Sequence, residues 1–224
     1  MKKLFFILNL ILAGGVVASD VCYILYGGLW LKSITSALFV LIGLVNLFFA
    51  IKTKSKHIKF SIVMAIGLVF AMAGDIVLNV YFIGGAALFA IGHIIFFFAY
   101  SCILKFSWHD IIAGCGIFVP SLIILVALPI FDFGGIMMQL VCIVYALIIS
   151  LMVGKAATNF FKEKSISNLI ILIGSVLFFF SDLMLVLDMF ANVGAICGIL
   201  CLATYYPAEI LLGYSIYQKA NENK

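Results

Sequence analysis

The sequence predicts an all-α membrane protein, a bundle of eight transmembrane helices with the N- and C-termini on the cytoplasmic side. Of the 224 residues, 67% are hydrophobic and 10% are charged, and the mean hydropathy is +1.34. An ordinary soluble domain is about half apolar and about a quarter charged. A chain of this length has too little interior to hide the excess apolar surface from water. The composition therefore requires a lipid bilayer as solvent.

The apolar runs divide the chain into eight segments, each close to the length of about 20 residues that crosses a bilayer core of about 30 Å. The segments are 4–24, 31–51, 60–81, 84–104, 110–130, 136–155, 167–188 and 194–216. Their connections are short, and no soluble or low-complexity stretch interrupts them. Residues 1–224 are therefore predicted to form a single transmembrane domain.

The lysine positions predict the orientation of these segments. With the N-terminus inside, 12 of the 13 lysines fall in cytoplasmic stretches. These are Lys2, Lys3, Lys52, Lys54, Lys56, Lys59, Lys105, Lys155, Lys162, Lys164, Lys219 and Lys224. The outward connections 81–85, 131–135 and 188–194 contain none. This is the positive-inside pattern, and the compact lysine-bearing loops suit a bacterial inner (plasma) membrane.

The first segment has two interpretations. Its sequence MKKLFFILNLILAGGVVAS has two lysines, an apolar stretch and then small residues, as a cleaved signal peptide has. Retention as the first helix is favoured, because eight spans place both ends of the chain on the lysine-bearing side.

Composition and motifs also narrow the function classes. No basic stripe lies on a soluble module, so nucleic acid is not an expected partner. The six cysteines form no CxxC pair and lie in apolar runs, so they are interpreted as small buried hydrophobes. No HxxxH or HExxH pairing is present to hold a metal, and no cofactor is expected.

Ionisable residues inside a span are rare and mark candidate functional sites. Asp75 lies six residues before Tyr81, and Asp182 lies six residues before Asp188, where the third and seventh segments end on the outer side. At about 1.5 Å per residue, both carboxyl groups are expected about 9 Å below the outer ends. Two acids at matched depth on parallel helices are predicted to share one cavity.

Other polar side chains at membrane depth complete the candidate site. They are Lys32, His93, Tyr100, Ser181, Tyr205, Tyr206 and Glu209. Lys32 is expected at the outward mouth, and His93 is expected to exchange hydrogen bonds with the acids. For Tyr100 and Tyr206 the alternative is hydrogen bonding between helices. For the two aspartates the alternative is pairing with Lys32, a tyrosine or a backbone group that only fixes helix packing.

Five further ionisable residues are predicted to be solvated and are left out of the site. Asp20 and Asp188 lie near the outer interface, and Asp110, His57 and His109 lie in cytoplasmic turns.

Taken in order, the polar motifs resemble those of one family. The matching positions are Lys32-Ser33, Gly74-Asp75, Gly85, Phe89, His93, Tyr100, Ser181-Asp182 and TYYPAE at 204–209. Together they resemble the YhhN-like family of eight-helix membrane proteins, which includes the animal lysoplasmalogenases. Two positions depart from the family pattern: Ser33 replaces proline, and Glu209 replaces glutamine with a potential anion.

The resemblance implies hydrolysis of the vinyl ether bond of lysoplasmalogens, giving a fatty aldehyde and glycerophosphocholine or glycerophosphoethanolamine. A vinyl ether is cleaved by adding a proton to its β-carbon, and the resulting oxocarbenium ion needs a nearby anion and a placed water, as in glycosidases. Asp75 and Asp182 are the implied catalytic pair, with their individual roles left open. Lys32 is expected to attract the phosphate of a lysophospholipid that arrives sideways from the bilayer. The oligomeric state is left open.

Two other function classes compete with this hypothesis. A lipid-binding protein or proton-coupled transporter would use the same buried acids and would favour broken helices. Of Pro120, Pro129 and Pro207, only Pro207 is expected in mid-span. A zinc-dependent membrane hydrolase of the alkaline ceramidase type needs clustered histidines, and only His93 lies within a span.

Overall fold

The structure, a computed structural model, describes residues 1–191, 193–194 and 196–222. Within them it contains eight α-helices: α1 (Lys2–Tyr26), α2 (Leu29–Lys52), α3 (Ile58–Leu78), α4 (Phe82–Ser101), α5 (Trp108–Ala127), α6 (Ile136–Lys162), α7 (Ile166–Phe190) and α8 (Ile196–Asn221). Every one of the eight is long and apolar enough to cross a membrane. The predicted fold class is confirmed.

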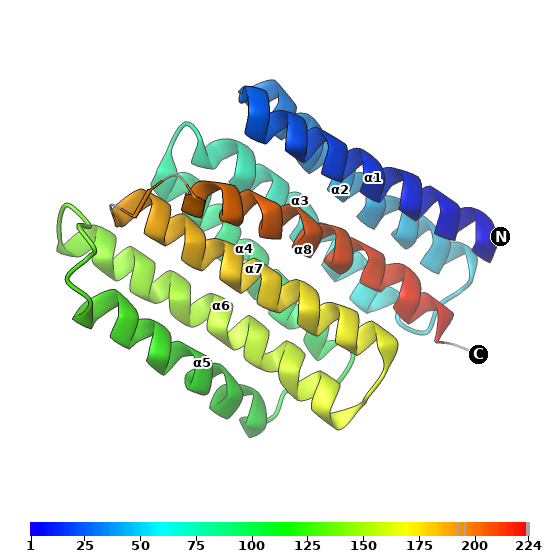
Figure 1. The fold of residues 1–224 in the computed structure, drawn as a ribbon. Helices are drawn as coiled ribbons and strands as arrows, with labels where there is room; N and C mark the ends of the chain where they lie inside the picture. The colour runs from blue at the N-terminus through cyan, green and yellow to red at the C-terminus, as the bar shows by residue number, and fades with distance from the viewer. Residues whose placement is uncertain (192, 195, 223–224) are drawn as a thin grey trace.

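The helices form two layers. In Figure 1, α1, α8, α7, α6 and α5 follow one another across the front, and α2, α3 and α4 lie behind them. Successive helices pack against one another except α4 and α5; α4 packs against α6 instead, and α8 contacts α1, α2, α3 and α7. Helix α8 continues through Pro207 without a break and packs against four other helices.

Glycine allows the closest of these helix contacts. A Cβ at Gly74 of α3 would lie 2.9 Å from the Phe89 ring of α4, so any larger residue would push the two helices apart. This contact brings the end of α3, which carries Asp75, against α4.

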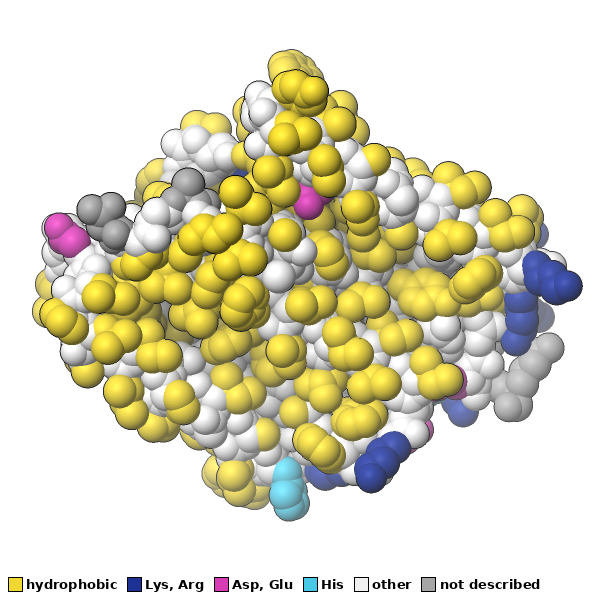
Figure 2. All heavy atoms as spheres, in the orientation of Figure 1, with side chains coloured by type: hydrophobic (Ala, Val, Ile, Leu, Met, Phe, Trp, Pro, Cys, Tyr) yellow, Lys and Arg dark blue, Asp and Glu magenta, His cyan; other side chains and the backbone are white. Residues whose placement is uncertain are grey.

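Lysines gather at one end of the bundle, which we call the lysine-rich end. Figure 2 shows the dark blue lysines toward the side where both termini lie in Figure 1, while apolar side chains cover most of the visible face. The connections α1–α2, α3–α4, α5–α6 and α7–α8 lie at the opposite, lysine-poor end. Lys224 falls outside the described residues.

The helix ends correct several predicted boundaries. Helix α3 ends at Leu78 instead of 81, and α7 continues to Phe190. The Asn79 side chain donates to the Asp75 carbonyl at 2.8 Å, which satisfies a carbonyl of the last turn of α3. Asp75 and Asp182 therefore lie about 4.5 Å and about 12 Å from the ends of their own helices, at about 1.5 Å per residue.

The prediction that Asp110 is solvated is wrong. Asp110 is fully buried. Its Oδ2 accepts a hydrogen bond from the Ser107 backbone N–H at 2.7 Å and forms an ion pair with Lys155 Nζ at 3.0 Å. Lys155, expected in a loop, is buried inside α6, which runs seven residues past its predicted end to Lys162. The two charges are buried because each neutralises the other.

Other surface predictions have mixed outcomes. His109 is exposed, as predicted, whereas His57 is half-buried. Burial and the neighbouring Lys219 lower the pKa of His57. All six cysteines are free, and three of them are exposed instead of buried. Cys22 and Cys115 lie on α1 and α5, where a small apolar side chain suits a lipid-facing position, and Cys102 lies in the turn after α4.

Candidate active site

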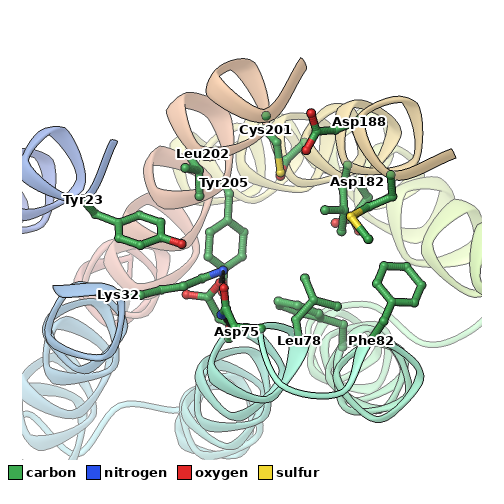
Figure 3. A pocket seen from close by; sticks show the side chains of 16 residues that line it. Tyr23, Lys32, Asp75, Leu78, Phe82, Asp182, Asp188, Cys201, Leu202 and Tyr205 are labelled. Carbon is green, nitrogen blue, oxygen red and sulfur yellow. Dashed lines mark hydrogen bonds and ion pairs between the residues drawn. The ribbon is translucent and has the colours of Figure 1, made fainter. Parts of the chain in front are cut away.

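A cavity of about 390 Å³ lies at the lysine-poor end of the bundle, among α1, α2, α3, α4, α7 and α8. Figure 3 shows side chains of these helices around the opening. Polar side chains of the lining are Tyr23, Lys32, Asp75, Asn79, Ser181, Asp182, Asp188, Cys201 and Tyr205; the other lining residues are Leu78, Phe82, Phe89, Leu185, Met189, Gly198 and Leu202. The cavity is therefore amphipathic.

Asp75, near the end of α3, is buried, and its carboxylate contacts three donor groups, one ammonium and two hydroxyls. Its Oδ1 lies 3.0 Å from Lys32 Nζ. Its Oδ2 accepts from the hydroxyl groups of Ser36 and, at 2.9 Å, Tyr206. Ser36 follows Lys32 by one helical turn, so both side chains leave α2 on the same face. Asp75 is thereby a carboxylate held in place beside a cation.

Asp182, on α7, has a different set of partners. Its Oδ2 accepts from the Tyr145 hydroxyl at 2.7 Å and lies 3.3 Å from His93 Nε2. Tyr145 and His93 Nε2 are themselves 2.9 Å apart, so α4, α6 and α7 contribute to one network. The Oδ1 atom has no hydrogen-bond partner among the described residues. Asp182 therefore presents a free carboxyl oxygen where Asp75 has none.

Both aspartates line the same cavity, as the sequence predicted, but from different walls (Figure 3). The rings of Phe89, Phe178 and Tyr205 meet edge to face just below them, with centroids 5.3–6.0 Å apart. All three side chains are buried, and edge-to-face packing of this kind stabilises the bundle centre. The arrangement places one fixed anion and one carboxyl with a free oxygen around a space that can hold a small part of a ligand.

Asp182 also borders two narrower apolar crevices. One is lined by residues of α3, α4, α6 and α7 and shares Leu78, Phe82 and Phe89 with the cavity. The other lies among α5, α6 and α7. Because both include Asp182 and Tyr145, the carboxyl group stands where a polar cavity meets apolar space inside the bundle.

The structure brings only some of the predicted site residues to the cavity. Lys32, Ser181 and Tyr205 line it, but Lys32 is buried and paired with Asp75 instead of standing free at the mouth. His93 and Tyr206 lie behind the wall and contact the aspartates through hydrogen bonds.

Tyr100 and Glu209 do not line the cavity. The Tyr100 hydroxyl lies 2.9 Å from Ser175 Oγ, deep in the bundle. This hydrogen bond joins α4 to α7, which is the alternative role that the sequence offered for Tyr100. Glu209 is fully buried, and neither carboxyl oxygen has a partner among the described residues. We therefore drop both residues from the substrate contacts.

Several residues of the site were missed from the sequence. Tyr145 sits in an apolar run with no motif around it, whereas Ser36 was recognisable as one turn beyond Lys32. The solvation predicted for Asp20 is wrong, because this carboxyl is buried against the bundle. Asp188 is exposed, as predicted, but it also lines the cavity.

Comparison with known proteins adds one positive finding. The sequence profile of the YhhN family matches residues 30–216, a stretch that contains every cavity-lining residue except Tyr23. No curated protein and no solved structure matches the chain.

Proposed function

The chain belongs to the YhhN family, and from this membership and the cavity we propose that it is a membrane-embedded hydrolase that cleaves the vinyl ether bond of lysoplasmalogens. The observation that carries the proposal is the pair of aspartates, one fixed by Lys32 and one with a free oxygen, on the walls of one amphipathic cavity. Its products are a fatty aldehyde and glycerophosphocholine or glycerophosphoethanolamine.

The reaction consumes one water molecule. A proton adds to the β-carbon of the vinyl ether, and the remaining electron deficiency is shared between the α-carbon and the ether oxygen. Water then attacks the α-carbon and loses a proton. The resulting hemiacetal breaks its bond to the glycerol oxygen, which takes a proton as the aldehyde forms.

Asp182 is the proposed general acid. Tyr145 and His93 both contact Oδ2, which orients the carboxyl group and leaves Oδ1 without a partner among the described residues. A general acid must lie within hydrogen-bond reach of the atom it protonates. The crevices that border Asp182 place apolar space around this carboxyl, where an alkenyl chain can lie.

Asp75 is the proposed anion that stabilises the oxocarbenium ion and orients the water. Its partners Lys32, Ser36 and Tyr206 hold the carboxylate before any substrate binds. Such preorganisation is what makes electrostatic stabilisation effective, because nothing has to reorient as charge develops. Tyr206 and Lys32 act through Asp75 as positioning residues.

The shape and polarity of the cavity fit a single-chain lipid. The polar residues Tyr23 and Lys32 stand on one side (Figure 3), and Asn79 lies 3.5 Å from Lys32 Nζ. The apolar side chains Leu78 and Phe82 line both the cavity and one of the crevices. A lysophospholipid of the outer leaflet would place its headgroup among the former. With the lysine-rich end in the cytoplasm of a bacterial cell, the cavity faces outward.

The test uses purified protein with an alkenyl lysophospholipid and with its saturated alkyl-ether analogue, and it measures released aldehyde. We expect aldehyde from the vinyl ether only, and a loss of about 100-fold or more in Asp182→Asn, the size of a general-acid contribution. Asp132→Asn, which alters an exposed carboxyl outside the cavity lining, is the control. Absence of aldehyde from the wild-type protein, or full activity in Asp182→Asn, would overturn the proposal.

A further inference from the structure

Asp188 has a position that the proposed reaction does not use. It lies on α7 six residues beyond Asp182, about 9 Å nearer the lysine-poor end at about 1.5 Å per residue, and it lines the same cavity. Its carboxylate makes no hydrogen bond or ion pair with any described residue. An unpaired carboxylate that lines the cavity and is exposed is available for a cationic ligand group.

The charge around the cavity is unbalanced. Three carboxyl groups, those of Asp75, Asp182 and Asp188, line it together with one ammonium group, that of Lys32. Lys32 is already 3.0 Å from Asp75 and neutralises that acid. Asp182 carries a proton before it acts as the proposed general acid, so Asp188 holds the uncompensated negative charge of this lining. A ligand that brings a positive charge to the mouth is therefore favoured over one that brings only negative charge.

The local packing directs the Asp188 carboxylate to the mouth. A Cβ at Gly198 of α8 would lie 3.1 Å from Asp188 Oδ2, so the absence of a side chain at Gly198 leaves the space that the carboxylate occupies. Met189, next to Asp188 on α7, and Phe82 of α4 also line the cavity. A carboxylate in a cavity that also holds a thioether and an aromatic ring suits an alkylated ammonium group.

Lys32 keeps a donor for a phosphate on the other side. Its ammonium has three N–H groups, of which one faces Asp75 Oδ1 and one faces Asn79 Oδ1 at 3.5 Å. Lys32 and Tyr23 stand on the α2 and α1 walls, whereas Asp188 stands on the α7 wall (Figure 3). The two sides of the mouth thus carry the two charges that a zwitterionic headgroup requires.

We propose that Asp188 binds the ammonium group of the lipid headgroup, with the phosphate toward Lys32, and that Asp188 thereby selects amine-bearing headgroups over headgroups that carry phosphate alone. This inference rests on the proposed function, because it assumes a lysolipid in the cavity. It assigns Asp188 to specificity and not to bond cleavage.

The experiment compares alkenyl lysophospholipids of one chain length with phosphoethanolamine, phosphocholine and phosphoglycerol headgroups. In the wild type, kcat/KM is expected to be higher for the two amine-bearing lipids. In Asp188→Asn this selectivity ratio falls by about fivefold, mainly through KM, as expected for one partly exposed charge contact. In Asp188→Lys the order reverses. Asp132→Asn, at an exposed acid outside the lining, keeps the wild-type ratio.

A binding measurement separates this inference from the reaction. The saturated alkyl-ether analogues are titrated into wild type and Asp188→Asn, with the same three headgroups. If no aldehyde forms but the wild type binds the amine-bearing analogues more tightly and Asp188→Asn loses the difference, the reaction fails and the headgroup site stands. If the two proteins discriminate headgroups equally, in binding or in turnover, the assignment of Asp188 is overturned.

Discussion

Two buried lysine–aspartate pairs stand at opposite ends of the molecule. Lys32–Asp75 lies at the lysine-poor end and Lys155–Asp110 at the lysine-rich end, and both have an N–O distance of 3.0 Å. The first pair lines the cavity, and its aspartate also accepts hydrogen bonds from two hydroxyl groups. The second pair lines none of the described cavities and joins the start of α5 to α6.

The comparison shows that a buried ion pair alone does not mark a site. A buried pair is costly to form and damaging to break wherever it lies. Lys32–Asp75 differs because it lines a cavity of about 390 Å³ and because a second carboxyl group, that of Asp182, lines the same cavity. Lys155–Asp110 has its backbone partners, the Ser107 N–H and the Lys105 carbonyl, and needs no ligand to explain it.

The largest predicted effect is on activity at the cavity end. Asp75→Asn removes the anion that is proposed to stabilise the oxocarbenium ion, and we expect kcat to fall about 100-fold or more. The substitution also leaves the buried Lys32 without its partner, which destabilises the fold. Activity is therefore measured per folded molecule, after size-exclusion chromatography. If the variant retained more than about a tenth of the wild-type kcat, Asp75 would have a structural role, like that of Asp110, and not a catalytic one.

The second prediction concerns stability at the opposite end. Lys155→Met leaves the fully buried Asp110 without its cation, and we expect a loss of about 3–5 kcal/mol in the free energy of unfolding. Reversible unfolding in mixed micelles measures this loss. The variant Asp110→Leu/Lys155→Met should recover most of it, since an apolar pair carries no desolvation penalty.

The same variants provide a contrast in activity. We expect the folded fraction of Lys155→Met to hydrolyse the vinyl ether within about twofold of the wild type, because no described cavity reaches Lys155. A selective loss of kcat without a loss of stability would show that the lysine-rich pair takes part in function and would break the comparison.

A smaller effect is predicted for the hydroxyl that orients Asp182. Tyr145→Phe removes the 2.7 Å hydrogen bond to Oδ2, and we expect kcat to fall about tenfold, corresponding to about 1.4 kcal/mol, with a smaller change in KM. The matched control is Tyr100→Phe, which removes another buried tyrosine hydroxyl, bonded to Ser175 and away from the cavity. Equal losses in both variants would indicate a packing effect alone.

The smallest effect is expected at the chain end beyond α8. Burial alone would raise the pKa of Glu222, but hydrogen bonds from Lys219 and Ser167 lower it below its ordinary value. The folded state therefore gains stability from the ionised form above the ordinary carboxyl pKa and loses it as pH falls through the lowered value.

We expect Glu222→Gln to reduce stability by less than about 1 kcal/mol at neutral pH, because the pair is partly exposed to solvent. The difference from wild type should vanish in acid, below the lowered pKa. Unfolding curves across this pH range check the prediction. A difference that stays constant with pH would assign the effect to lost packing and not to charge.

The sequence predicted the helices well because the bilayer imposes a length and a polarity on each span. It also predicted that Asp75 and Asp182 share a cavity, because a carboxylate within a membrane span must face the interior of the bundle or a cavity. Both inferences depend on the free energy of transfer into lipid. An unpaired backbone group or an isolated charge is strongly unfavourable there, so its position in the sequence is informative.

The sequence was less informative where partners come from distant helices. Lys155 and Asp110 looked like loop residues, because nothing local shows that α6 extends to Lys162 and brings the lysine beside α5. Tyr145 looked like one aromatic among many until α6 was seen against α7. Likewise, the different partners of Asp75 and Asp182, from which their roles are proposed, depend on which helices pack together.

The most direct test of the central claim is a double-mutant cycle on kcat/KM for the vinyl ether, using Asp75→Asn, Asp182→Asn and the double variant. If the two carboxyl groups act on one bond in one cavity, the double variant should be about as slow as the slower single variant, because residues that act as a unit are strongly non-additive. Losses that multiply in the double variant would mean that the two aspartates contribute independently, and the account of a shared catalytic pair would be contradicted.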